Sequence, residues 1–525
     1  MQESRIMRNC GGGGDDDDDD DDGHVTKACD YTLRLVWGAS KHEARRPSVV
    51  AQTTPSTVEI VCIQASRSTE TSVVVPDVAS RQLLPLPRYL PNGVPLPPRY
   101  RRLLGYFTED ILASLSCHPS IHEDLCRGLV PAALTSPHLL SACLALSAAG
   151  FLSRGLSEVD GIEISRVLGH LQHSGLALLR AALDDGRRRR SSSSSNNNSS
   201  SSRSQTPDET VPVTCLIWCL ADVFACGRGG SSWRIHLRGI KALIDDNHAY
   251  RNFGTVSGVS RMAMKHLYLL YLSLQTLPYV PPLHHAGQRD LPTAHGAQDA
   301  DMEASSSTST RPSIDGFLGY SEELLHALQQ INALSSRGEE DASASASAFT
   351  DASLRAQSDI LLGKLKGMIR RDARTPLEIS IGGAPLTDEQ GGEFSLCHGT
   401  FQQATLVHAY RRLYRMPSGA PPIQAAVAAI RDMVSEMTQG RPCHTWVAMA
   451  MPLFTLGCEA FTPPQQAFVL DKIDKFEACL GSLHVRIIRQ ALEDIWRARA
   501  SLGDVDGDLC ASELLETLQY NIILF

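Results

Sequence analysis

The stretch Ser136-Pro-His-Leu-Leu-Ser-Ala-Cys-Leu-Ala-Leu-Ser-Ala-Ala-Gly-Phe151 has the spacing of a buried helix. Ser136 is a typical N-cap residue, and Pro137 suits the first helical position, where no intrahelical hydrogen bond needs its missing N–H. From Leu140, apolar or small residues recur at i, i+3, i+4, i+7 and i+11, ending at Phe151. Because this period places them on one face of a helix, the stretch predicts a helix with one buried stripe.

Two further stripes follow near the carboxyl end of the chain. Gly481 separates them and suits a helix stop, because glycine adopts the left-handed conformation of a C-cap without steric cost. This arrangement predicts an antiparallel αα-hairpin. The two stripes consist of Val469, Ile473, Phe476 and Leu480, and of Val485, Ile488, Leu492 and Ile495.

Composition extends the helical prediction to the rest of the chain. Hydrophobic residues make up 42 % of the 525 residues and aromatic residues only 6 %, so that Leu and Ala carry most of the apolar surface. Leu and Ala favour helices, whereas β-branched and aromatic side chains favour sheets. We therefore predict an all-α fold, a large domain of packed antiparallel helices.

The chain divides into two regions by composition. Residues 1–98 include eight consecutive aspartates at 15–22 and end in a proline-rich stretch, which favours disorder with at most a short strand near 73–75. Residues 99–525 have helical spacing and form the predicted folded domain. Because loop-closure entropy grows slowly with length, low-complexity segments are predicted as loop insertions in it, at about 186–207, 284–312 and 337–352.

The aspartate run accounts for most of the formal net charge of −9, so the rest of the chain is nearly neutral. A neutral domain has no overall attraction for nucleic acid, and any DNA contact must be local. The fourteen cysteines are scattered, which favours a reducing cytosolic or nuclear location. The longest apolar stretch, 139–152, is shorter than the roughly 20 residues of a spanning helix. We expect no secretion signal and no membrane partner.

The sequence lacks the common motifs of catalytic and phosphate-binding sites. It contains no G-x-S-x-G, H-E-x-x-H or G-x-x-x-x-G-K-[ST] pattern. Residues 227–232 could offer backbone N–H groups to an anion, but a loop with a helix cap is the simpler interpretation. Cys215, Cys219 and Cys226 lie in an apolar helical stretch and are interpreted as buried thiols, since zinc needs four convergent ligands. We predict no enzymatic activity and no cofactor bound by this chain.

One tight basic cluster stands at the start of a Ser/Asn-rich segment. It consists of Arg187, Arg188, Arg189 and Arg190. Placed at the mouth of a loop, it is a candidate nuclear import signal that receptors could reach. The alternative is a solvated charge run after a helix end.

A second candidate site lies on the predicted helix 231–244, which Ser231 or Ser232 can cap. Trp233 and His236 share a stripe with three aliphatic residues, and Arg238 lies on another face. Together with Trp218 from the preceding apolar segment, these residues form a candidate effector or interaction site between helices. The alternative is that Trp218, Trp233 and His236 only pack in the core.

In order along the chain, these helices resemble the fungal-specific transcription factor domain that follows binuclear zinc-cluster DNA readers. The resemblance covers about residues 100–500 and is more specific in combination than in any one segment. Its segments are Pro131-Ala-Ala-Leu-Thr-Ser-Pro-His with the helix that follows, Ser231-Ser-Trp-Arg-Ile-His-Leu-Arg-Gly-Ile-Lys-Ala-Leu-Ile, Thr405-Leu-Val-His-Ala-Tyr-Arg-Arg-Leu-Tyr-Arg-Met-Pro, Pro452-Leu-Phe-Thr-Leu-Gly-Cys-Glu-Ala and Ala491-Leu-Glu-Asp-Ile-Trp.

The resemblance implies a helical domain that regulates transcription by RNA polymerase II in the nucleus and has no catalytic role. It also implies, as partners, the transcription machinery or a DNA-binding relative, dimerisation with itself or another chain, and DNA as a family expectation. The residues alone leave an alternative open, a helical module that binds a small effector or another protein without direct DNA contact.

Members of this family usually begin with six cysteines that bind two zinc ions. Here Cys10, Cys29 and Cys62, spaced 19 and 33 residues apart, precede the domain and do not fit such a cluster. Zinc is therefore expected only if a cluster lies upstream. Three explanations remain: an upstream exon missing from the gene model, which we expect, a partner that acts through a DNA-binding relative, or an unrecognised DNA contact surface.

Overall fold

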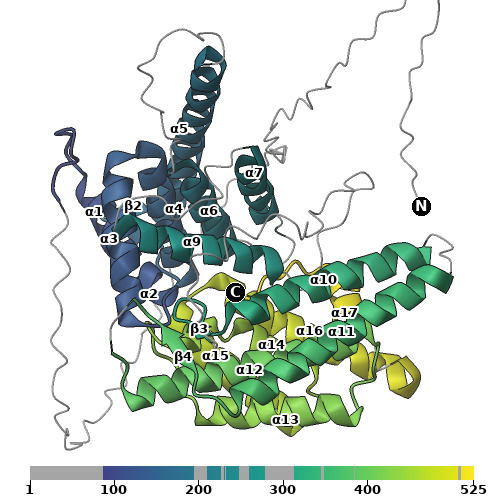
Figure 1. Cartoon of the computed structure of the whole chain (residues 1–525). Helices are drawn as coiled ribbons and strands as arrows, with labels where there is room; N and C mark the ends of the chain where they lie inside the picture. Colours follow the sequence, from purple (N-terminus) through teal and green to yellow (C-terminus); the bar gives the residue numbers. More distant parts are fainter. Residues whose placement is uncertain are drawn as a thin grey trace, which may run out of the picture. The chain divides into compact units, whose positions relative to one another are not determined.

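The computed structural model describes residues 87–193, 210–225, 230, 232–246, 259–277, 313–343, 348–382, 385–506 and 510–524 of the chain. The chain divides into the units Met1–Ser80 and Arg81–Phe525, and all described residues belong to the second unit. Among the described residues, the regular elements are helices apart from a few short strands, which confirms the predicted all-α class (Figure 1). The predicted strand at 73–75 and insertion at 284–312 lie outside the described residues.

The helices and strands fall into two halves along the chain. The amino-terminal half contains α1 (Pro98–Tyr106), η1 (Phe107–Ile111), α2 (Leu112–Ser114), α3 (Pro119–Thr135), α4 (Pro137–Ser153), β1 (Glu158–Val159), β2 (Ile162–Glu163), α5 (Ile164–Ser193), α6 (Thr210–Ala225), α7 (Ser232–Asp246) and α9 (Val259–Thr276). The carboxyl-terminal half contains β3 (Ser313–Asp315), α10 (Glu322–Ser343), α11 (Ala348–Asp372), β4 (Glu378–Ser380), α12 (Asp388–Leu413), α13 (Pro421–Glu436), η3 (Thr445–Ala448), α14 (Ala450–Cys458), α15 (Pro463–Leu480), α16 (Leu483–Asp506) and α17 (Ala511–Thr517).

Helices α4 and α6 form the centre of the amino-terminal half. α4 begins at Pro137 as predicted, although the Ser136 side chain makes no capping hydrogen bond. The prediction of one buried stripe was too narrow, because α4 is buried on nearly all sides and residues 211–224 of α6 are all buried. A helix that is apolar all round must be enclosed by other elements. α5 and α6 pack on α4, and α7 packs on α6.

Close helix contacts in this half depend on small residues. A Cβ atom at Gly175 of α5 would lie 2.7 Å from Cζ2 of Trp218 and 2.8 Å from the Cβ of Ser141, so only glycine fits between α4 and α6. This contact lets the large Trp218 side chain be fully enclosed.

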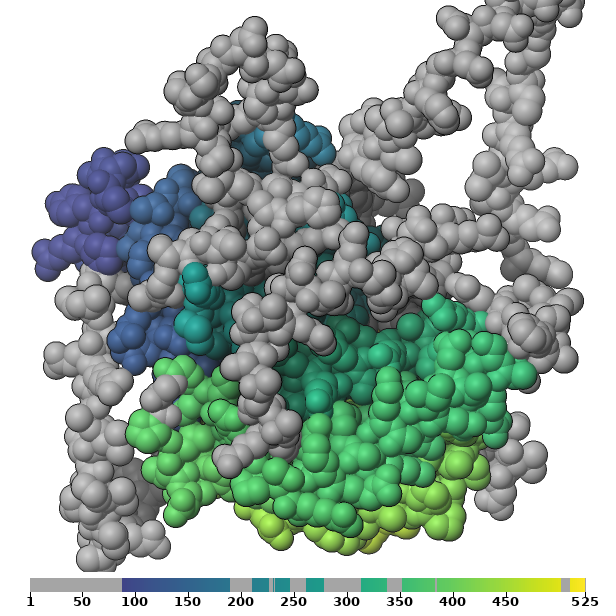
Figure 2. Space-filling view, in the orientation of Figure 1, coloured from purple at the N-terminus to yellow at the C-terminus, as the bar shows by residue number. Residues whose placement is uncertain are grey.

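Helix α12 is the centre of the carboxyl-terminal half. It packs against α10, α11, α13 and α14. Its start is fixed by a capping box in which the Thr387 side chain accepts from the Gln390 N–H and the Gln390 side chain accepts from the Thr387 N–H. Two backbone N–H groups that have no carbonyl partner within the helix are thereby satisfied. Figure 2 shows residues of α10 to α13 as a continuous green surface in the lower part of the view.

The predicted αα-hairpin near the carboxyl end is confirmed. α15 ends at Leu480, α16 starts at Leu483, and the two helices pack against each other. Gly481 is the left-handed C-cap of α15 with φ of 62°. All four residues of the second predicted stripe are buried, and Leu480 alone of the first is partly exposed.

The short strands add local constraints. β1 and β2 pair antiparallel across Asp160 and Gly161, which both have positive φ, the geometry that a two-residue hairpin turn needs. β3 and β4 pair in parallel and join the segment before α10 to the segment before α12.

Two predicted loop insertions are shorter than expected. α5 continues to Ser193, so residues 186–193 have helical backbone, and α10 and α11 cover 337–343 and 348–352. These segments are rich in Arg, Ala, Ser and Glu, and extending an existing helix needs no new nucleus. Composition therefore predicted the polar character of these segments correctly, but it predicted loops where the backbone is helical.

The carboxyl-terminal segment joins the two halves. Ile522, Ile523 and Leu524 are buried, and the Leu524 N–H donates to the carbonyl of Leu277 after α9 at 3.0 Å. From the other side, Nε2 of His484 in α16 lies 2.7 Å from the carbonyl oxygen of Ile523. The segment is thus held between α9 and α16.

None of the described helices combines the length and the apolar character that crossing a bilayer requires.

Replacing Gly481 with alanine is predicted to lower the free energy of unfolding by about 1–3 kcal/mol, because an L side chain is strained at this positive φ. The new Cβ would also lie 2.4 Å from Nε of Arg154. Urea denaturation of the full chain measures the change. The control is Gly363→Ala in α11, where a Cβ meets nothing within 4 Å. It should raise stability by about 0.5–1 kcal/mol. Equal stability of Gly481→Ala and the parent chain would contradict the assignment of Gly481 as the left-handed C-cap of α15.

Candidate interaction site at helices α6 and α7

Helix α7 lies on α6 through the predicted apolar stripe. Trp233, Leu237, Ile240 and Ile244 are buried, and Trp233 is only 1 % exposed. The helix begins at Ser232, whereas Ser231, the other predicted cap, lies outside the described residues. The stripe therefore serves the packing of α7 on α6.

One polar pair crosses this helix contact. Nε2 of His236 lies 3.3 Å from Oδ2 of Asp222 in α6, and both side chains are largely shielded from solvent. Asp222 is the one charged residue in α6. A buried carboxylate needs a partner, so His236 explains how Asp222 is accommodated in an otherwise apolar helix.

Arg234, which was not among the predicted site residues, connects α7 to the carboxyl-terminal segment. Its Nε and Nη2 atoms donate to Oδ1 of Asn521 at 2.9 and 2.6 Å, and its guanidinium lies over the Trp233 ring at 4.5 Å. Asn521 in turn donates to the carbonyl of Gly230 at 3.0 Å. Burial, and then the charge of Arg238, lower the pKa of Arg234 to about 10.

The predicted residues are only partly brought together. Trp233 and His236 lie on α7 against α6, but Arg238 is exposed on the outer side of α7. Trp218 is buried where α6 approaches Gly175 of α5. None of the four residues lines the cavity of about 70 Å³ between α6, α9 and α16. Their role in effector binding stays a prediction, while their structural contacts are those of a helix interface.

The candidate import signal lies on the exposed end of α5. Arg187 and Arg188 are exposed, and Nη1 of Arg188 lies 3.8 Å from Asp185. The backbone is helical through Arg189 and Arg190. The two described arginine side chains are accessible to another molecule.

Three of the segments that carry the family resemblance meet in the core of the carboxyl-terminal half. Nε of Arg411 in α12 lies 3.3 Å from Oε1 of Glu459 after α14, and both side chains are almost fully buried. Nε2 of His408 lies 3.0 Å from the hydroxyl of Thr455. Trp496 of α16 donates from Nε1 to the carbonyl of Gly457 at 2.8 Å. These segments are therefore neighbours in space and act as structural ties.

A buried His–Asp pair is also structural. Nε2 of His398 lies 3.0 Å from Oδ2 of Asp372, and Nδ1 accepts from the Ser321 N–H at 3.4 Å. Burial raises the pKa of Asp372, but the His398 hydrogen bond and the Arg371 guanidinium outweigh it and hold that pKa below its usual value. Both ring nitrogens of His398 are therefore engaged within the chain.

The described cysteines behave as apolar side chains. Cys215 and Cys219 are buried free thiols, as predicted, and burial raises the pKa of Cys215 to about 12. Cys226 lies outside the described residues. In the described part of the chain, no group of three or more His, Cys, Asp or Glu side chains could hold a metal ion.

These features define a large helical domain whose buried polar side chains tie helices together. The profile of the fungal specific transcription factor domain matches residues 102–524, and the chain belongs to this family. The family is one of transcription regulators, and the role it implies for the domain is non-enzymatic. No curated protein and no solved structure matches the chain.

Arg234→Ala is predicted to lower the free energy of unfolding by about 1–2 kcal/mol. The Asn521 side chain would lose the two hydrogen bonds that Arg234 donates, and the Trp233 ring would lose the guanidinium that lies over it. Arg238→Ala, four residues on and exposed, is the matched control and should change stability by less than about 0.5 kcal/mol. Urea denaturation of both variants measures the difference. Equal losses would show that the Arg234–Asn521 contact contributes nothing to the packing of α7.

Proposed function

We propose that this protein is a nuclear regulator of RNA polymerase II transcription that acts through its helical domain by contacting other proteins. The observation that carries the proposal is the family match over residues 102–524. The buried His–Asp and Arg–Glu pairs support it, because both serve packing between helices. Regulation by such a domain depends on surfaces and on its stability rather than on chemistry at a catalytic centre.

The partners proposed are the transcription machinery, a DNA-binding relative or a second copy of the chain. The near-neutral charge outside the aspartate run favours protein partners over direct capture of DNA by the whole domain. We also propose that nuclear entry depends on an import signal formed by Arg187, Arg188, Arg189 and Arg190. The exposed position of Arg187 and Arg188 supports this assignment.

Fusing the full chain to an unrelated DNA-binding domain is predicted to change transcription of a reporter that carries its sites by at least about threefold. Reporter mRNA is the measurement, with the DNA-binding domain alone as control. A fusion that enters the nucleus at normal abundance and leaves reporter mRNA unchanged would overturn the proposed function.

The same experiment includes an arm without the DNA-binding domain, in which the fluorescently tagged chain is located in cells. Replacing the four arginines with alanine should shift it from the nucleus to the cytosol. The matched control replaces Lys364, Arg370 and Arg374, which are exposed basic residues in α11 or just after it, and should leave the location unchanged. If the variant without the four arginines still entered the nucleus, the import signal would have to lie in another segment.

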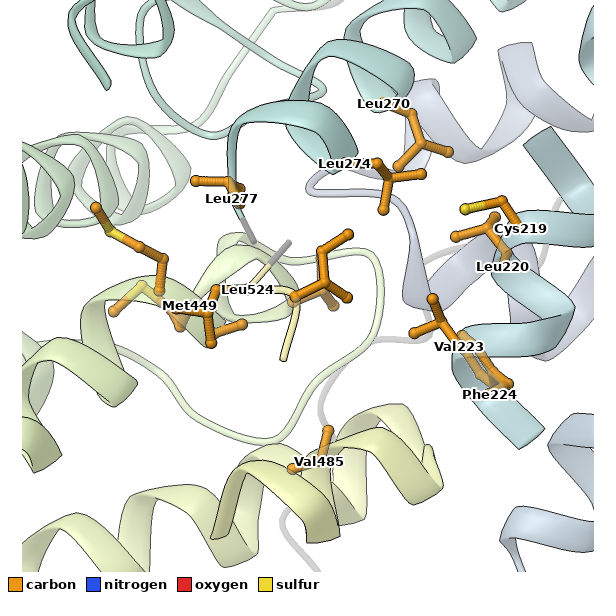
Figure 3. Packing of buried hydrophobic residues seen from close by; sticks show 14 of the residues in the cluster. Cys219, Leu220, Val223, Phe224, Leu270, Leu274, Leu277, Met449, Val485 and Leu524 are labelled. Atoms are coloured by element: carbon orange, nitrogen blue, oxygen red, sulfur yellow. The ribbon is translucent and has the colours of Figure 1, made fainter. Parts of the chain in front are cut away.

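A second function, binding of a small effector, is supported by a different observation, a cavity between the two halves of the unit. Figure 3 shows Val223, Leu270 and Val485, which line this cavity, pointing from α6, α9 and α16 toward the same region.

A further inference from the structure

The first described segment of the unit is rich in arginine. Residues 87–108 contain Arg88, Arg99, Arg101 and Arg102 and no Asp or Glu. Among the described residues, Arg102 is the one of these four that forms an ion pair, with Asp160 at 3.6 Å, and its side chain is still 64 % exposed. Outside the aspartate run the chain is nearly neutral, so this segment is a local concentration of positive charge.

Backbone contacts fold the beginning of this segment into a small two-stranded turn. The Leu96 N–H donates to the carbonyl of Arg88 at 2.9 Å. Tyr89 and Pro95 face each other in an antiparallel bridge. We call residues 88–96 the amino-terminal turn.

The amino-terminal turn presents side chains to solvent. Tyr89 is 61 % exposed and Val94 is 50 % exposed, whereas Leu96 is buried and anchors the turn to the unit. Arg88, next to Tyr89, is also exposed. Figure 1 shows the turn projecting beyond the packed helices ahead of α1, and in Figure 2 the purple residues stand at the left edge of the view. An exposed aromatic ring beside a guanidinium is a typical contact surface.

Helix α1 continues the positive charge from the base of the turn. Arg99 and Arg102 lie three residues apart and are therefore neighbours on the helix surface. Leu103 and Leu104 are the buried residues of this helix. Because Arg88 is bonded to the residue three before Arg99, the Cα atoms of Arg88 and Arg99 lie within about 16 Å of each other. The three arginines therefore belong to one local surface.

The shape and chemistry of this surface fit duplex DNA. A guanidinium donates in a planar fork that matches a phosphate group. The major groove, about 12 Å wide and about 8.5 Å deep, admits a two-stranded ribbon. From Arg88 at the base to Pro91 near the tip the chain spans about 10 Å, which is enough to enter the groove while the arginines stay at its edge. A membrane surface or an acidic peptide has no groove for the projecting turn.

We infer that residues 88–102 bind double-stranded DNA, with the amino-terminal turn in the major groove. Arg88, Arg99 and Arg102 contact backbone phosphates, and the Tyr89 ring packs inside the groove. Such phosphate contacts carry little sequence information, so the site holds DNA without selecting a sequence. The inference goes beyond the proposed regulatory role and does not depend on it.

The test measures fluorescence anisotropy of a labelled DNA duplex with the purified full chain at several salt concentrations. We expect a Kd of about 1–100 µM, and log Kd should rise with log salt with a slope of about 3, because each phosphate contact contributes about 0.9. An unchanged anisotropy at the lowest salt would overturn the inference. Displacement of the duplex by polyglutamate or phosphatidylserine vesicles as readily as by unlabelled duplex would also overturn it, because any polyanion would then fit.

Two variants locate the site. Replacing Arg88, Arg99 and Arg102 with alanine should weaken binding at least about tenfold and lower the salt slope by about 2–3. Tyr89→Ala removes the ring without changing the charge, so it should weaken binding about two- to fivefold and leave the salt slope unchanged. The matched control is the triple α11 variant of the localisation experiment, which removes the same charge and should bind like the parent chain.

Equal losses of affinity in the two triple variants would show that binding follows net charge, and they would overturn the site. Parental affinity in the variant without Arg88, Arg99 and Arg102 would overturn it as well. Circular dichroism checks the fold of each variant. If this triple variant failed to fold, Tyr89→Ala would decide, because parental affinity in Tyr89→Ala would contradict the turn in the groove.

Because the reporter experiment supplies a separate DNA-binding domain, its outcome is independent of this site. A chain that binds the duplex through these arginines but leaves the reporter unchanged would support the DNA contact and contradict the regulatory role. The opposite combination would contradict the DNA contact alone.

Discussion

The structure depends on one constraint, the enclosure of helix α6 on every side. Residues 211–224 are all buried, and their one charged side chain, Asp222, is paired with His236 of α7. An apolar helix of this length is stable only when surrounding helices remove it from water. α4 and α7 pack against it, α5, α9 and α16 complete the contacts, and α16 belongs to the other half of the unit. Enclosing α6 therefore joins the halves into one domain.

Hydrogen bonds also connect the two halves. Asn521 binds Arg234, Ile523 binds His484, and Leu524 binds the carbonyl of Leu277, so a short segment near the carboxyl end links α7, α9 and α16. Beside it lies a cavity of about 70 Å³.

Local sequence predicted the helices well and the connections poorly. Pro137, the stripes of α15 and α16 and Gly481 are local signals, and each was placed correctly because its period or cap depends on neighbours in sequence. The end of α5 and the start of α11 were missed, because Ser-rich and Arg-rich composition does not reveal that a helix continues. Trp218, Trp233 and His236 were predicted as a candidate effector site, with core packing as the alternative, and the structure places them at contacts between helices. Arg234 was missed because its partner, Asn521, is 287 residues away. The cavity had no sequence signal, because the residues of its wall come from both halves of the unit and meet only through folding.

The central claim is that the described unit is a single cooperative domain closed around α6, with both halves contributing to its stability. Amide hydrogen exchange of the full chain, measured across a series of low denaturant concentrations, tests this claim most directly. The account predicts that amides of α6 and of α12 exchange in the same slowest class with the same denaturant dependence, because both require global unfolding. If α6 exchanged through a separate opening at lower free energy while α12 remained protected, the halves would be independent and the account would be contradicted.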